Sequence, residues 1–95
     1  MDERKIVRTK NTGVFFGKVE KIDGNTITLS NARRLWYWSG ASSLSELAQY
    51  GTANAGSCKF PCAVDEIVVN EWLEIINVTE EAAKSIDKVK EGTQR

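Results

Sequence analysis

Residues 14–30, VFFGKVEKIDGNTITLS, contain two β-strand patterns separated by a tight-turn signal. Val14–Ile22 is rich in β-branched and aromatic side chains, and Thr26–Ser30 alternates polar with apolar residues, which is the period of a half-buried strand. Residues 23–25, Asp-Gly-Asn, tolerate the positive φ that a tight hairpin turn requires. This stretch therefore predicts an antiparallel β-hairpin.

Further strand patterns lie on both sides of the hairpin. We expect strands at Lys5–Lys10, Arg33–Trp38, Val64–Asn70 and Trp72–Val78, the last two of which can also form one bent strand. A weak turn at residues 31–32, Asn-Ala, separates the hairpin from the Trp-rich strand at Arg33–Trp38. Together these patterns predict an antiparallel sheet of about five strands.

Two helices have recognisable ends. Ser43 and Glu46 fit a capping box, and Gly51 is a natural stop for a short helix after the Trp-rich strand. Thr79 caps a C-terminal helix that has acidic residues in its first turn. The predicted fold class is therefore α+β, a small antiparallel sheet with one short helix after the Trp-rich strand and a C-terminal helix. We expect a single domain over residues 1–91 and a frayed tail at residues 92–95.

Composition argues against several classes of function. Thirteen Lys+Arg balance thirteen Asp+Glu, and this zero formal net charge disfavours generic binding of nucleic acid or of a membrane surface. No histidine occurs, which removes the commonest general base and zinc ligand. Cys58 and Cys62 lack the two further ligands of a structural zinc site, so we expect them to pack in a turn. We therefore expect a protein that is not an enzyme and uses no metal and no cofactor.

The distribution of charge and apolar residues indicates a cytoplasmic protein with one positive half. The charged start, MDERK, is followed by no apolar run, and no stretch approaches the roughly 18 apolar residues of a membrane span. Residues 1–34 hold eight basic side chains against four acidic ones, whereas residues 35–74 hold Lys59 against five acidic ones. The positive half can bind an anion despite the zero net charge.

The segment RRLWYWSG at residues 33–40 concentrates aromatic and basic side chains. In a strand, alternation would place Arg34, Trp36 and Trp38 on one face. Arg33, Leu35 and Tyr37 would lie on the other face. Indoles in line with an arginine suit a flat nucleobase with phosphate nearby. Three interpretations stay open: core packing under a helix, a subunit interface, and direct contact with a ligand.

The segments that flank the short helix can also carry function. Ser39, Gly40, Ser42 and Ser43 are small residues before its N-terminus, where backbone N–H groups and hydroxyls can bind an anion. Capping of the helix by Ser43 with Glu46 is the alternative. After the helix, residues 51–63 show no period, and so long a loop in a small domain is often functional.

The run NARRLWYWSGASSLSELA at residues 31–48, followed by CKFPC at residues 58–62, resembles a family of short, uncharacterised proteins encoded by bacteriophages and prophages. The resemblance extends from Val14 to Val78. It implies a viral protein made in the cytoplasm of an infected bacterial host. Small non-enzymatic phage proteins are commonly inhibitors of host defence, and several act as sponges that bind a host cyclic nucleotide. This is a likeness of setting and not of motif.

We therefore hypothesise a homo-oligomeric binding protein that sequesters a nucleotide-type defence signal, including a cyclic dinucleotide, at or near a subunit interface. The candidate ligand-binding residues are Arg33, Arg34, Trp36, Tyr37, Trp38, Ser39, Gly40, Ser42 and Ser43. The aromatic side chains would stack on the base, the arginines would pair with phosphate, and the small residues would supply donors. The alternative is a phage interaction protein that binds a host or virion protein through the same Trp, Tyr and Arg patch.

Overall fold

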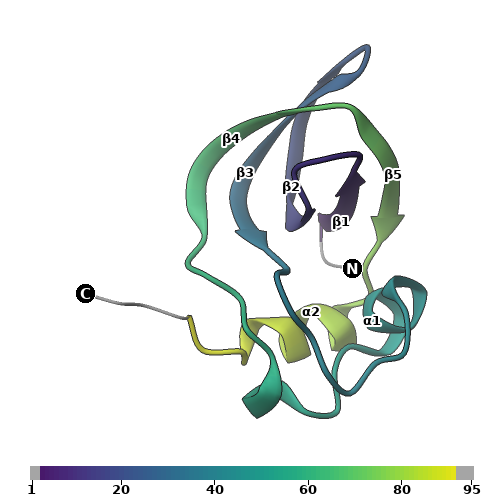
Figure 1. Cartoon of the computed structure of the whole chain (residues 1–95), viewed down its shortest axis with the longest axis vertical. Coiled ribbons are helices and arrows are strands. Elements are labelled where there is room, and N and C mark those ends of the chain that lie inside the picture. Colours follow the sequence, from purple (N-terminus) through teal and green to yellow (C-terminus); the bar gives the residue numbers. More distant parts are fainter. Residues whose placement is uncertain (1–2, 92–95) are drawn as a thin grey trace.

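The computed structural model describes residues 3–91 and confirms the predicted α+β fold (Figure 1). The strands are β1 (Arg4–Thr9), β2 (Val14–Asp23), β3 (Thr26–Arg34), β4 (Val64–Asn70) and β5 (Trp72–Asn77). The helices are α1 (Leu44–Tyr50), the short 3-10 helix η1 (Ala55–Ser57) and α2 (Glu80–Asp87). The predicted frayed tail, residues 92–95, lies outside the described residues.

The five strands form one antiparallel sheet in the order β4-β3-β2-β1-β5. Val64–Asn70 and Trp72–Asn77 are therefore two strands on opposite edges of the sheet. Only Glu71 lies between them, with φ 59 and its N–H donated to the Asn25 carbonyl at 2.7 Å. Because the chain passes from one edge to the other in so few residues, the sheet is strongly curved. Figure 1 shows β4 and β5 as one arch with β1 and β2 inside it.

Both faces of the sheet are buried over part of their area. Successive side chains of a strand point to opposite faces, so the adjacent pair Phe15 and Phe16 belongs to two different cores. The inner core, inside the curve, contains Val7, Phe15, Ile27, Leu29, Ala32 and Val69. The outer core joins Ile6 and Phe16 to buried residues of α1, α2 and the loop before β4. Figure 1 shows both helices at the same end of the sheet.

The end of β3 differs from the prediction. The predicted turn at Asn31-Ala32 is wrong, because β3 continues to Arg34 through a bulge at which Asn31 has φ 48 and the register with β2 shifts. Gly17 allows this close approach, since a Cβ there would lie 3.0 Å from the Cα of Ala32.

The predicted strand Arg33–Trp38 is also wrong beyond its first two residues. Leu35 donates its N–H to the carbonyl of Val14, the first residue of β2, at 2.8 Å. Past this point β2 offers no further residue to pair with, so the chain leaves the sheet. It keeps one isolated antiparallel bridge, between Tyr37 and Lys59.

The predicted helix ends are confirmed. The Ser43 hydroxyl accepts the Glu46 N–H at 3.1 Å, and the Thr79 hydroxyl accepts the Ala82 N–H at 3.1 Å. Gly51 ends α1 at φ 77, where a Cβ would lie 2.6 Å from the Cβ of Ser85 on α2. Glycine therefore permits both the backbone conformation and the close packing of the two helices. Within residues 3–91, no helix is long and apolar enough to cross a membrane.

Candidate ligand-binding pocket

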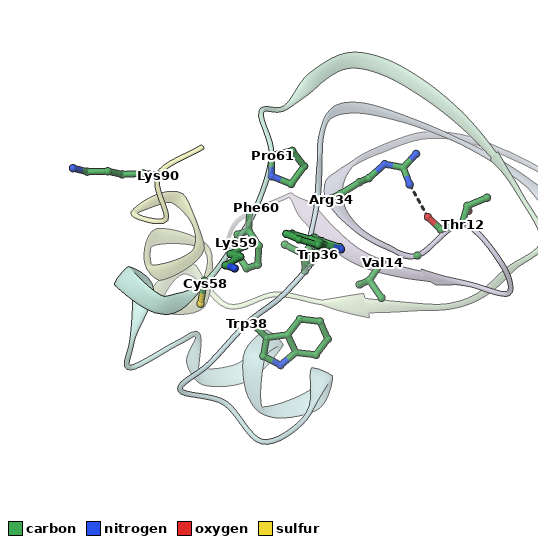
Figure 2. A pocket seen from close by; sticks show the side chains of 12 residues that line it. Thr12, Val14, Arg34, Trp36, Trp38, Cys58, Lys59, Phe60, Pro61 and Lys90 are labelled. Carbon is green, nitrogen blue, oxygen red and sulfur yellow. Dashed lines mark hydrogen bonds between the residues drawn. The ribbon is translucent and has the colours of Figure 1, made fainter. Parts of the chain in front are cut away.

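A pocket of about 760 Å³ lies beside the end of β3 (Figure 2). It is lined by Thr12, Gly13, Val14, Arg34, Leu35, Trp36, Trp38, Cys58, Lys59, Phe60, Pro61 and Lys90. We call it the Trp36 pocket. Its volume falls in the range of about 300–1,000 Å³ that is typical of small-molecule sites.

Backbone hydrogen bonds bring the lining segments together. The bond from Leu35 N–H to the Val14 carbonyl joins the chain after β3 to the start of β2. Tyr37 donates its N–H to the Lys59 carbonyl at 3.1 Å, and Lys59 donates its N–H to the Tyr37 carbonyl at 2.7 Å. These two bonds join the chain after β3 to the segment before β4. Leu35 and Phe60 are buried in the outer core. The pocket is therefore built on fixed backbone and buried side chains.

Trp36 is the most exposed large hydrophobic residue among residues 3–91, with 72 % of its surface accessible. The Lys59 ammonium lies 5.8 Å from the centroid of its ring, within reach of a cation–π contact. An exposed indole of this size loses the stabilisation that burial would give. It offers a flat π surface to a ligand instead.

Arg34 lies at the border of the pocket towards the β1–β2 turn. Its guanidinium lies over the Phe15 ring at 4.7 Å, and its Nη1 donates to the Thr12 carbonyl at 2.7 Å. Within the described residues this is the guanidinium's one hydrogen bond, so further N–H donors remain for an anion. Packing on Phe15 holds the group in place.

The lining is positively charged. It contains Arg34, Lys59 and Lys90, and none of the described residues that line it is acidic. Lys59 is the one basic residue of the segment 35–74, and the fold places it in the pocket. A protein of zero formal net charge thus has a pocket with a locally basic lining.

Arg33, by contrast, lies on the outer face and away from the Trp36 pocket. Within residues 3–91, its guanidinium donates only to main-chain carbonyls, those of Pro61 (2.7 Å), Val89 (2.6 Å), Phe60 (3.3 Å) and Ile86 (3.3 Å). Burial lowers the pKa of Arg33, and the nearby charges of Glu91 and Asp87 partly offset this. The guanidinium therefore connects the segment before β4 to the end of α2 and to Val89 just after it.

The small residues before α1 use their polar groups in hydrogen bonds to α1 and to the loop that follows it. Glu46 accepts bonds from the N–H and the hydroxyl of Ser42 and donates its own N–H to Ser43. Ser39 donates its N–H to the Cys58 sulfur at 3.4 Å, and the Gly40 carbonyl accepts from Ala53 at 3.3 Å. None of Ser39, Gly40, Ser42 and Ser43 lines the Trp36 pocket. The geometry favours the capping interpretation of this segment.

The two remaining aromatic candidates differ. Trp38 is half-buried against the outer core and also lines the Trp36 pocket, where Figure 2 shows its ring below Trp36. Tyr37 is 52 % exposed and does not line the pocket. The structure therefore brings together Arg34, Trp36 and Trp38, the three residues that alternation groups on one face.

Several lining residues were not among the sequence candidates. Cys58, Lys59, Phe60 and Pro61 belong to the long loop at residues 51–63, whose length is of a kind often associated with function. Thr12, Gly13, Val14 and Lys90 carry no local signal, because only the tertiary fold brings them to the pocket.

Cys58 is buried, Cys62 is exposed, and both are free thiols. Residues 3–91 contain no cluster of three or more metal-ligating side chains.

Comparison with known proteins identifies one family. Residues 2–86 match the family model described as "Domain of unknown function (DUF6948)". No curated protein and no solved structure matches the chain.

Proposed function

The chain belongs to the DUF6948 family of unknown function, and from its pocket we propose that it is a binding protein that sequesters a nucleotide-type ligand without turning it over. The observation that carries this proposal is the exposed Trp36 indole in a pocket that has three basic and no acidic lining residues among those described.

The residues of the pocket match the two parts of a nucleotide. A base can stack on Trp36, and base–aromatic stacking contributes about 1–3 kcal/mol per base. The guanidinium of Arg34 can donate to phosphate oxygens, with Lys59 as a second positive charge. Trp38 and Phe60 supply apolar surface around the base.

Binding without chemistry is supported by the lining itself. It offers no carboxylate among its described residues, and the sequence has no histidine, so neither of the commonest general bases is at hand. Tight sequestration needs only contacts of the kind that the Trp36 pocket provides.

The resemblance of residues 31–48 and 58–62 to phage and prophage proteins supports a biological setting. In an infected bacterium, a small protein of this kind would withdraw a nucleotide signal of host defence from its receptor. We further propose that the protein acts as a homo-oligomer in the host cytoplasm, with a second copy covering the open side of the pocket.

A thermal-shift screen against mono-, di- and cyclic nucleotides tests the proposed function. A ligand at about a hundred times its Kd stabilises the folded state by roughly 2.7 kcal/mol, or several degrees in Tm. We expect one class of nucleotide to give such a shift with the wild type and not with Arg34→Ala. Lack of any shift across the panel would contradict nucleotide sequestration by this protein.

A second candidate function is binding of a host or virion protein. The exposure of two adjacent aromatic residues, Trp36 (72 %) and Tyr37 (52 %), favours it, because Trp and Tyr are common interface hot spots. The two functions differ in their response to Tyr37→Ala. This substitution should leave nucleotide binding at the pocket intact, whereas a protein interface centred on the patch would lose affinity.

A further inference from the structure

We propose that Arg33 is a positioning residue of the Trp36 pocket, although its own side chain lies on the outer face and does not line the pocket. It acts through residues 59–61, Lys-Phe-Pro, which form one wall of the pocket and which we call the Phe60 wall. This inference rests on the proposed function and adds a residue that sets the shape of its site.

The Phe60 wall belongs to a loop and has little regular structure to hold it. Figure 2 shows its side chains along one segment beside Trp36. The wall lies outside the five strands, and its bridges are isolated ones, from Lys59 to Tyr37 and from Phe60 to Glu91. Single bridges restrain a segment less than the ladder of a sheet does, so further contacts are needed to fix its position.

Arg33 supplies contacts to the backbone of this wall. Its Nη2 donates to the Phe60 carbonyl at 3.3 Å, and its Nε donates to the Pro61 carbonyl at 2.7 Å. One planar group therefore orients two consecutive peptide units. The guanidinium also lies 5.4 Å from the centroid of the Phe60 ring, which is buried. The core holds this ring, whereas Arg33 orients the backbone that carries Pro61 into the pocket.

The remaining bonds of the guanidinium anchor it at the end of α2. It donates to the Val89 carbonyl at 2.6 Å and to the Ile86 carbonyl at 3.3 Å. The side chains of Val89 and Ile86 are buried in the outer core. Arg33 thus connects the Phe60 wall to a backbone that the core fixes. The rigid fork of an arginine suits this connection, because a lysine ammonium is a single point donor on a flexible stem.

The strand links this wall to the other binding groups. Arg33 and Arg34 are consecutive residues of β3, so the backbone fixes Arg34, the proposed phosphate ligand, relative to the group that holds the wall. A shift of the wall changes the distance between Pro61 and Trp36, which line the same pocket. Because a binding site that is loose by about 1 Å loses much of its function, Arg33 should affect affinity without touching the ligand.

Amide hydrogen exchange of the full chain tests whether Arg33 fixes the wall, without any ligand. Arg33→Lys keeps the charge but not the fork. Val69→Ala is the control, because Val69 is buried in the inner core and does not line the pocket, so its loss lowers stability elsewhere. We expect Arg33→Lys to speed exchange of the Lys59 amide at least about ten-fold relative to amides of β2 and β3, and Val69→Ala to leave this ratio unchanged.

Isothermal titration of the same variants tests the effect on binding. The ligand is whichever of AMP, GMP, cyclic di-AMP and cyclic di-GMP binds the wild type most tightly, at a temperature at which the variants are folded. We expect Arg33→Lys to bind it at least about ten-fold more weakly, and Val69→Ala to bind it as the wild type does. Arg33→Gln, which lacks both the charge and the fork, should behave like Arg33→Lys and replaces it if that variant does not fold.

The outcomes separate the two claims. An unchanged exchange ratio in Arg33→Lys, or a raised ratio with unchanged affinity, would overturn the positioning role. Equal weakening of binding by Arg33→Lys and Val69→Ala, or failure of both Arg33 variants to fold, would assign Arg33 to stability alone and overturn it too. If none of the four nucleotides binds the wild type, the proposed function falls, and the exchange ratio alone decides whether Arg33 fixes the wall.

Discussion

Arg33 and Arg34 are neighbours in β3, and their guanidinium groups hydrogen-bond on opposite faces of the sheet. Arg33 donates to the Val89 carbonyl at 2.6 Å, beside the outer core, and Arg34 donates to the Thr12 carbonyl at 2.7 Å, at the border of the pocket. Strand alternation alone produces this division. It gives Arg33 a role in stability and leaves Arg34 at the pocket, where the proposed function assigns it a role in ligand binding.

The first prediction concerns this division. Arg33→Ala should destabilise the fold by about 2–4 kcal/mol, because it removes the donor to the Val89 carbonyl after α2 and to the Pro61 carbonyl before β4. Arg34→Ala removes an exposed side chain and should cost less than about 1 kcal/mol. Urea unfolding of both variants measures the two free energies. Equal losses would contradict the assigned roles.

Trp36 should matter for binding and not for folding. Trp36→Ala should change the free energy of unfolding by less than about 0.5 kcal/mol, because most of the side chain is exposed, and should cost about 1–3 kcal/mol of nucleotide binding. Tyr50→Ala is the control, since Tyr50 is 67 % exposed on α1 and does not line the pocket. Equal binding by the two variants would refute base stacking on Trp36.

Gly51 should be sensitive to any side chain. Gly51→Ala combines left-handed strain with a Cβ that meets Ser85, so we expect a loss of about 2–4 kcal/mol. Gly24→Ala isolates the strain, because Gly24 also has positive φ but nothing within 4 Å of a Cβ, and should cost only about 1–2 kcal/mol. Denaturant titrations of the two variants measure both losses in the free energy of unfolding. A larger loss at Gly24 would show that contact between α1 and α2 at Gly51 is not tight.

Self-association is a separate expectation. Sedimentation equilibrium should give a mass of at least two chains of 10.6 kDa at micromolar concentration, because an open pocket needs a second copy to enclose its ligand. A mass of one chain, with and without bound nucleotide, would contradict the homo-oligomer while leaving the pocket itself unaffected.

Local patterns predicted most of the fold. The period of two in Thr26–Ser30, the turn residues at 23–25 and the caps Ser43 and Thr79 each act over a few residues, and each prediction was confirmed. The end of β3 was predicted wrongly because Asn31 can turn the chain or form a bulge. In the structure Ser30 and Ala32 pair with Glu66 and Val64 of the remote strand β4, which keeps Asn31 within the strand, and no local pattern indicates that pairing.

Only the part of the candidate site that comes from the Trp-rich segment could be predicted from the sequence. Alternation grouped Arg34, Trp36 and Trp38, and all three line the Trp36 pocket. Alternation could not show that the Arg33 guanidinium donates its hydrogen bonds to carbonyls of distant segments. Nor could it find Lys90, which the packing of α2 brings beside a segment more than fifty residues earlier in the chain.

The most direct measurement is calorimetric titration of mono- and cyclic dinucleotides into the wild type, Arg34→Ala and Arg8→Ala at physiological salt. Arg8 is the matched control, because it pairs with Glu74 on the sheet and does not line the pocket. Nucleotide sequestration predicts that at least one ligand binds the wild type and Arg8→Ala equally, and Arg34→Ala at least about ten-fold more weakly, with Tm little changed. Absence of binding by every nucleotide, or equal affinity in Arg34→Ala, would contradict it.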